Sequence, residues 1–234
     1  MNVNIFTHDL RGIWLVVPDT LLVSVAILAL GIVLGMILYV LQQRNNFIIR
    51  SICRLYVSYF RGVPLLIHLL IFYYGLPVVL QVISTAFNLH INYEHLNPIY
   101  AVLLSYTMYS SSFISEIIRG SFMSVGQDQI EAATALGYSR AQAFWKIKLP
   151  QSLNESVPKF LNYYVLLIRQ LSLAFMVSFV DIFAKAKLES AINYRYIESF
   201  CAAAVVYWIL CVVLTFIFKK YENYLRRYEK VVVV

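Results

Sequence analysis

Long apolar stretches, separated by shorter polar ones, are the main feature of this sequence of 234 residues. A helix rises 1.5 Å per residue, so about 20 mostly apolar residues cross the roughly 30 Å hydrocarbon layer of a bilayer. Stretches of this length recur along the chain. They predict five membrane-spanning helices, over Thr20–Leu41, Pro64–Phe87, Pro98–Ile118, Val157–Val180 and Ser199–Phe218.

The composition agrees with lipid as the solvent of this chain. Hydrophobic residues make up 61% of it and the mean hydropathy is +0.71, whereas soluble domains contain roughly 45–50% apolar residues. The spans leave no room for a second globular domain, so we expect one all-α membrane domain over residues 1–234. Cys53, Cys201 and Cys211 show neither a disulfide pattern nor a metal-binding spacing. The first 20 residues lack the pattern of a removable signal peptide.

The positions of the basic residues predict how the chain is oriented. A net charge of +7 could indicate a nucleic-acid partner, but most of the 19 Lys and Arg residues follow the first, third and fifth spans. Under the positive-inside rule these segments are cytoplasmic, which places the N-terminus outside and the C-terminus inside. The positive charge therefore favours anionic lipid headgroups, and we expect no nucleic-acid partner.

A long polar segment, residues 127–150, lies between the third and fourth spans on the predicted cytoplasmic side. Residues 129–136 are rich in helix formers, and Gly137 can cap the end of that helix. Ser139 can begin a second short helix, which we expect to end at Ile147 because Pro150 interrupts helices. The pattern predicts two short helices that meet at a glycine elbow and project from the membrane.

This segment also matches a known pattern, EAA-x3-G-x9-I-x-LP, at every fixed position. It resembles the EAA loop of the permease subunits of ABC importers. In that family the loop forms the coupling helix that docks on a cytoplasmic ATPase subunit. The resemblance therefore implies a coupling role for Glu131, Ala132, Ala133, Gly137, Ile147, Leu149 and Pro150.

Other segments are similar to one branch of that family, the polar amino acid permeases of the histidine, glutamine and cystine type. Residues 55–65 (LYVSYFRGVPL), 20–24 (TLLVS) and 116–120 (EIIRG) carry the similarity, which extends from about residue 18 to 228. The fourth and fifth spans resemble permeases for sulfur-containing amino acids such as cystine. One departure is residues 169–173 (RQLSL), where the branch usually has Lys, an acid, Thr, Ser and Leu.

The resemblance implies a set of partners in the cytoplasmic membrane of a prokaryote. These are a second permease subunit, identical or different, a pair of ATPase subunits, and an extracytoplasmic solute-binding protein that delivers an amino acid. The chain has no G-x-x-x-x-G-K-[ST] phosphate loop. We therefore expect that the chain is not an enzyme and holds no cofactor or metal. ATP and Mg²⁺ should be bound by the ATPase subunits.

Polar residues within the spans are candidates for the solute pathway, because an ionisable group in hydrocarbon is costly. Ser105, Tyr109, Ser112 and Glu116 recur at helical spacing and should face the inside of the bundle. Glu116 and Arg169 could line a cavity, form a structural ion pair, or leave Glu116 paired with Arg119. The candidate pathway residues are Ser112, Glu116, Arg169, Gln170 and Ser172.

The sequence leaves several alternatives open. An ion-coupled secondary transporter of amino acids should show an inverted internal repeat, and five spans cannot be divided evenly into two such halves. A membrane enzyme should show a catalytic motif, and none is present. His68 could be a proton relay or a packing residue. His90, Glu94 and His95 lie close together in the sequence, without the spacing of a metal site.

Overall fold

The computed structural model describes residues 2–88 and 96–225, and within these ranges its regular elements are all helical. This confirms the all-α class for the described residues. His90, Asn92, Glu94, His95 and the last basic residues of the chain lie outside them. The elements are α1 (Val3–Trp14), α2 (Val17–Gln42), α3 (Phe47–Gly62), α4 (Leu65–Phe87), α5 (Pro98–Met123), α6 (Gln127–Ala135), α7 (Arg140–Ala143), the π-helical turn η1 (Phe144–Lys148), α8 (Leu149–Gln170), the 3₁₀ helix η2 (Leu171–Val177), α9 (Ile182–Asn193) and α10 (Tyr196–Leu225).

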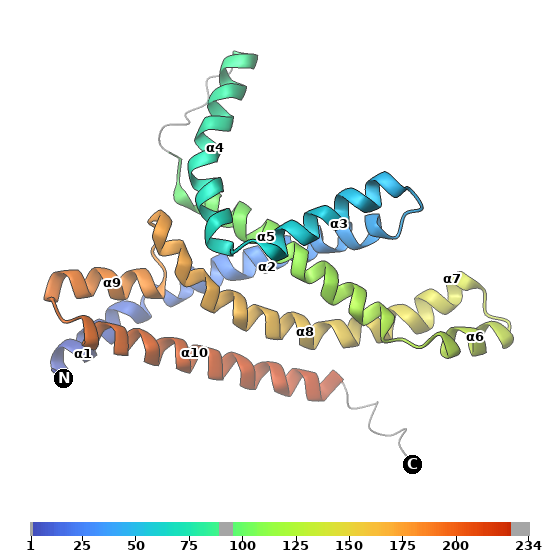
Figure 1. Cartoon of the computed structure of the whole chain (residues 1–234). Coiled ribbons are helices and arrows are strands. Elements are labelled where there is room, and N and C mark those ends of the chain that lie inside the picture. Colours follow the sequence, from blue (N-terminus) through green and yellow to red (C-terminus); the bar gives the residue numbers. More distant parts are fainter. Residues whose placement is uncertain (1, 89–95, 226–234) are drawn as a thin grey trace.

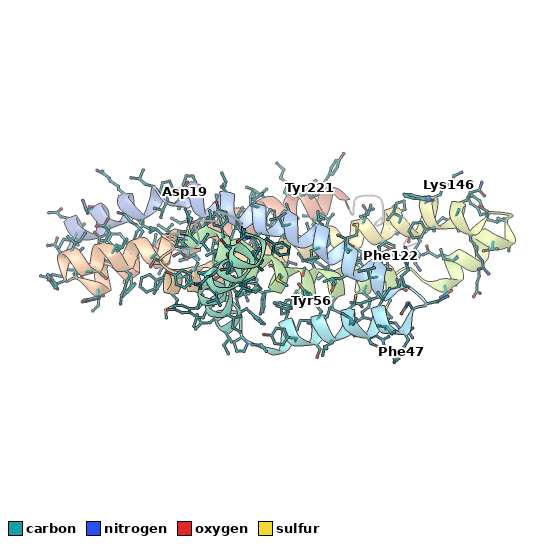
Figure 2. All side chains as sticks on the ribbon, turned by 90° about the horizontal axis from the view of Figure 1, so that it is seen from above. Asp19, Phe47, Tyr56, Phe122, Lys146 and Tyr221 are labelled. Carbon is teal, nitrogen blue, oxygen red and sulfur yellow. The ribbon has the colours of Figure 1, made fainter. Side chains whose placement is uncertain are left out.

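The molecule is elongated, and its long helices run along its length (Figure 1). Helices α2, α5, α8 and α10 form the body. Helices α1 and α9 lie at one end with the N-terminus, while α6 and α7 project from the other. Helix α4 leaves the body at a steep angle. Figure 2 shows the same separation, with Asp19 and Lys146 toward opposite ends.

Four helical segments of the described chain are long and apolar enough to cross a membrane. They are Val3–Gln42, Leu65–Phe87, Arg140–Val177 and Tyr196–Tyr224. These contain or closely match four of the five spans expected from the sequence. The remaining one, Pro98–Ile118, lies in α5, which has 26 residues but several serines. The five-span count and the orientation therefore stay predictions.

The position of α5 explains its polar character. It packs against α2, α3, α4 and α8, so protein rather than lipid surrounds most of its surface. Tyr106 and Ile114 are completely buried in the core. Ser110 and Ser111 are equally buried, and their hydroxyls bond the phenol oxygens of Tyr163 and Tyr56, at 3.0 and 2.9 Å. A helix whose neighbours are protein can carry hydroxyl groups, because those neighbours hydrogen-bond them.

Two glycines allow α2 to lie directly against α5. A Cβ atom at position 35 would be 2.8 Å from Ile114 Cγ2, and one at position 31 would be 3.1 Å from Ser110 Cβ. Gly31 and Gly35 are four residues apart, so they fall on one face of α2. This is the small-xxx-small pattern that brings membrane helices into close contact.

A break at Gly62–Pro64 separates α3 from α4, so the chain turns where the sequence predicted only the start of a span. Helix α3 was not expected as a separate helix. Its C-terminal half is attached to α5: the Tyr56 hydroxyl donates to the Met108 carbonyl at 2.9 Å, and the Arg61 guanidinium lies 5.4 Å from the ring centre of Phe113. Helix α4 therefore begins against α5, where Leu65 and Leu69 are buried, and then leaves the bundle.

We expect Gly35→Ala to destabilise the bundle, because the new methyl group must displace Ile114 or separate α2 from α5. Overpacking of this kind costs about 1–3 kcal/mol. Gly75→Ala is the matched control, since a Cβ at position 75 of α4 meets no atom within 4 Å. The yield of monodisperse protein after solubilisation, with its thermal midpoint, measures the difference. Equal behaviour of the two variants would show that the α2–α5 contact is not limiting.

Candidate functional site

The predicted glycine elbow is present, and its geometry is that of a Schellman cap. Helix α6 ends at Ala135, and Gly137 follows with φ of +88°. The Gly137 N–H donates to the Thr134 carbonyl and the Tyr138 N–H to the Ala133 carbonyl, both at 3.0 Å. Only a residue that tolerates the left-handed region satisfies both carbonyls in this way, which explains the glycine.

The second arm of the elbow begins at Ser139. Its hydroxyl accepts the Gln142 N–H at 3.2 Å, and the Gln142 side chain accepts the Ser139 N–H at 2.9 Å, which completes a capping box. The elbow is thus fixed by backbone geometry on one side and by a cap on the other.

The expectation that this helix ends before Pro150 was wrong. The helical path continues from α7 through the π-helical turn η1 into α8, and Pro150 stands in the first turn of α8. In η1 the Leu149 N–H reaches back to the Phe144 carbonyl. In a π turn each N–H bonds to the carbonyl five residues before it. A Pro in the first turn of the following helix lacks only an N–H that needs no partner within that helix, so the helical path continues. The elbow is therefore a direct extension of α8.

The motif residues fall into two groups by exposure. Glu131, Ala132, Gly137 and Pro150 are exposed, whereas Ala133 is buried and Ile147 and Leu149 are half-buried. Bulky apolar side chains are also exposed on the elbow, as they are over much of the described chain. We name this the elbow surface; it consists of Leu136, Tyr138, Phe144 and Trp145.

Aromatic stacking joins the elbow to the helical body. The Phe144 ring stacks on Phe122 of α5 with 6.2 Å between ring centres, and Phe122 stacks on Tyr39 of α2 at 5.1 Å. The Gln151 side chain also donates to Gln129 of α6 at 2.8 Å. The elbow is therefore connected to α2, α5 and α8.

The predicted pathway residues of α5 are engaged by near neighbours. The Ser112 hydroxyl is buried and donates to the Tyr109 carbonyl at 2.6 Å. Glu116 Oε2 lies 2.6 Å from Arg119 Nη2 and 3.8 Å from Arg61 Nη1. Among the described residues, no ion pair joins Glu116 to Arg169. The structure thus favours the local Glu116–Arg119 pair over an ion pair across the bundle.

The predicted residues at the end of α8 face different neighbours. Arg169 is exposed and lines a groove of about 520 Å³ with Cys211, Thr215 and Lys219 of α10. Its Nε–H is 3.4 Å from the Val165 carbonyl. Gln170 faces α5 instead, where its side chain meets the Tyr109 hydroxyl and its carbonyl accepts the Tyr106 hydroxyl at 2.8 Å.

Ser172, the last predicted pathway residue, lies at the start of η2. Its hydroxyl donates to the Arg169 carbonyl at 2.8 Å, which closes the last turn of α8. The five predicted residues therefore do not converge on one cavity. They divide between the core face of α5 and the two sides of α8.

A group of potential metal ligands lies at the end of the molecule formed by α1 and α9. In the described chain, His8, Asp9 and Glu189 bring one ligand atom each within 4.8 Å of one another, at the end formed by α1 and α9. Asp9 Oδ2 already accepts Ser199 Oγ at 2.6 Å and Asn193 Nδ2 at 3.0 Å. These bonds tie α1 to α9 and α10, a contact that the sequence did not reveal.

A second buried carboxylate, Asp181, caps the start of α9. It accepts the Ala184 N–H at 2.9 Å and the Tyr207 hydroxyl at 2.8 Å. Burial raises the pKa of this carboxyl, and the two hydrogen bonds act in the opposite direction. Asp181 therefore anchors α9 to α10 through its side chain.

The described chain is a body of helices, four segments of which are long and apolar enough to cross a membrane, and this is the architecture of a membrane protein. The family comparison agrees. The chain belongs to the family described as the binding-protein-dependent transport system inner membrane component, whose model matches residues 23–227. It is thus a permease subunit of an ABC importer, and the expectation that it is a transport component rather than an enzyme is confirmed.

Individual relatives are similar along most of their length. The chain is 31% identical over 190 residues to a probable amino-acid ABC transporter permease protein, PatM, of Vibrio harveyi, which covers 80% of each chain. It is 30% identical over 210 residues to the L-cystine transport system permease protein TcyL of Bacillus subtilis, with 90% of this chain and 85% of that one covered.

Solved structures show the same fold. An amino acid ABC transporter crystallised with histidines matches with a TM-score of 0.79 and 22% identity, over 91% of this chain and 94% of that one. An inward-facing form of the methionine transporter MetNI matches with a TM-score of 0.63 and 18% identity, over 96% and 99% of the two chains.

We expect Gly137→Ala to strain the elbow, because a left-handed conformation costs a non-glycine residue about 1–2 kcal/mol. Gly137→Asn should cost less, since asparagine visits this region more readily. No atom lies within 4 Å of a Cβ at this position, so steric crowding does not contribute. Hydrogen exchange of the backbone amides at positions 137 and 138 should be fastest in the Ala variant, slower in the Asn variant and slowest in the wild type. Equal exchange in all three would contradict the cap.

Proposed function

We propose that this chain is the membrane-spanning subunit of an ATP-driven importer of polar amino acids, in the cytoplasmic membrane of a prokaryote. It works with a second permease subunit, a pair of ATPase subunits that bind ATP and Mg²⁺, and an extracytoplasmic solute-binding protein. Glutamine and cystine are the solute candidates, because relatives about 30% identical are described as glutamine and L-cystine permeases.

The elbow surface is the observation that supports the ATPase partner. Leu136 and Trp145 are 80% and 66% exposed at one end of the molecule. The elbow carries every fixed position of the EAA pattern, with Glu131 on its surface. An apolar patch held by a rigid cap and projecting beyond the bundle suits a groove on another protein. The five-span topology, with this elbow as the coupling helix inside the cell, is part of the proposal.

We propose that the solute pathway runs beside α8, whose Arg169 faces α10 and whose Gln170 faces α5. Arg169 contributes a guanidinium that can bind a carboxylate with two parallel hydrogen bonds. Gln170 and Ser172 are its neighbours at the end of α8, and Ser112 and Glu116 are the candidates on α5. Ion-coupled secondary transport is the alternative, and it requires no ATPase partner.

The coupling proposal is tested with Trp145→Asp and Glu131→Lys, in complexes reconstituted with the cognate ATPase subunits. A charge on the elbow surface must be desolvated on docking, so we expect co-purification of the ATPase and ATP-driven amino acid uptake to fall at least about tenfold. Ile192→Asp is the matched control, since Ile192 is 75% exposed on α9 at the other end. It should leave ATPase binding unchanged.

Two outcomes would contradict the proposal. Normal ATP-driven uptake by both elbow variants would show that the elbow does not couple the ATPase to transport. Uptake that follows an imposed ion gradient and continues without ATP or ATPase subunits would favour the secondary transporter.

We expect the elbow to lie inside the cell and the α1–α9 end outside. Single cysteines at Ser139 and Ile192, in a variant without Cys53, Cys201 and Cys211, should react differently with a membrane-impermeant maleimide. Only the Ile192 position should be labelled in intact cells, and both should be labelled after lysis. Labelling restricted to position 139 in intact cells would reverse the orientation.

A further inference from the structure

The hairpin formed by α2 and α3 carries arginines without acidic partners. Arg44 follows the end of α2, and Arg50 and Arg54 lie in the first half of α3. Within the described ranges, none of these three guanidinium groups forms an ion pair. The sequence itself contains no Asp or Glu between Asp19 and Glu94, so this hairpin cannot neutralise its own positive charge.

Other basic residues of the described chain do have acidic partners. Arg119 and Arg61 both reach Glu116, at 2.6 and 3.8 Å, and Lys185 reaches Glu189 at 2.9 Å. The arginines of the hairpin therefore lack a compensation that the same chain provides elsewhere. Their orienting effect under the positive-inside rule needs only their number and not their arrangement.

The hairpin lies where one surface of the membrane is expected. Helix α2 has 26 residues and is about 39 Å long, so after crossing about 30 Å of hydrocarbon it ends among lipid headgroups. Phe47, the first residue of α3, lies toward the same end of the molecule as Lys146 in Figure 2, away from Asp19. Arginine side chains on α3 are long enough to extend from the helix to the headgroup layer.

Helix α3 presents three different faces. Its buried face consists of Cys53, Val57 and Phe60. An exposed apolar face, which we name the α3 stripe, consists of Ile48, Ile52, Leu55 and Tyr59. The stripe residues are four, three and four positions apart, so they follow one side of the helix. Arg50 and Arg54 are four positions apart and lie on the side between the buried face and the stripe.

The chemistry of these groups defines the ligand that they suit. A guanidinium group only donates hydrogen bonds, and its planar fork matches two oxygens of a phosphate. Gln42 Nε2, at the end of α2, is a further buried donor without a partner among the described residues. The matching ligand offers acceptor oxygens, a net negative charge and an apolar part that covers the stripe. An anionic phospholipid has all three, whereas a soluble phosphate lacks the apolar part.

We propose that Arg44, Arg50 and Arg54, together with the α3 stripe, form a binding site for an anionic phospholipid in the leaflet on the elbow side. The arginines bind the phosphate oxygens of its headgroup, and its acyl chains lie along the stripe. This site goes beyond the proposed function, because it requires no transported solute. It also goes beyond a general attraction to the membrane, because it assigns one headgroup to named side chains.

The test is a titration of the delipidated permease–ATPase complex in detergent with phosphatidylglycerol or phosphatidylcholine of the same chain length, followed by native mass spectrometry. Wild type should bind phosphatidylglycerol at least about tenfold more tightly. Arg50→Gln/Arg54→Gln should raise the Kd of the tightest phosphatidylglycerol site at least about tenfold. Arg11→Gln/Lys187→Gln is the matched control, since it removes the same charge from exposed positions on α1 and α9 and should leave this Kd unchanged.

Arg50→Lys/Arg54→Lys separates the lipid site from an effect on membrane insertion. It keeps the positive charge that orients the chain and loses the planar fork, so the complex should assemble normally while the Kd rises at least about threefold.

Three results would overturn the proposal. Wild-type affinity in the Gln variant would show that the arginines serve orientation alone, and an equal loss in the control would show that only total charge matters. Competition by soluble glycerol 3-phosphate at the lipid's own concentration would show that the ligand is a free phosphate. Binding is measured without solute or ATP, so its outcome is independent of the proposed transport function.

Discussion

The close contact between α2 and α5 is the constraint on which the rest of the structure depends. Gly31 and Gly35 bring the α2 backbone within van der Waals distance of Ser110, Ser111 and Ile114. Lipid tails are as apolar as the side chains, so close packing, rather than escape from water, must hold membrane helices together. With α2 this near, α5 lies at the centre of the bundle, and its hydroxyls are within reach of Tyr56 and Tyr163.

Hydropathy and local turn chemistry made much of the fold predictable. Apolar runs predicted four segments that are helical and long enough to cross a membrane. Gly137 predicted the elbow, because glycine readily adopts the left-handed backbone conformation found there. Two features were not predictable from local rules. Pro150 reads as a helix stop, yet the π turn at Phe144–Lys148 carries the helix past it. The break between α3 and α4 depends on how Tyr56 and Arg61 attach to α5, which no local pattern encodes.

The candidate site, too, was predictable only in part from the sequence. The sequence identified polar residues within spans, and Gln170 lies at a polar meeting point. The sequence left three possibilities for Glu116, and the structure has the local pair with Arg119, one turn away. Arg169 faces the groove beside α10 instead. Whether a buried side chain is satisfied depends on three-dimensional neighbours. For that reason the sequence left His68 open between a proton relay and a packing residue, and only the structure shows that its nitrogens have no hydrogen-bond partner among the described residues.

The continuity of α8 through Pro150 gives the elbow a mechanical connection to the membrane core. A helix of 22 residues is about 33 Å long, so α8 extends from the elbow to Gln170 without a break. Beyond Gln170 the helix tightens into the 3₁₀ segment Leu171–Val177, and a stretch of this kind often marks a hinge. Pro158 lies inside α8 and removes one backbone hydrogen bond from it, although the helix continues. Arg169 and Gln170, the last residues before the 3₁₀ segment, face α10 and α5 respectively, so the elbow and these two candidate residues lie at opposite ends of one helix.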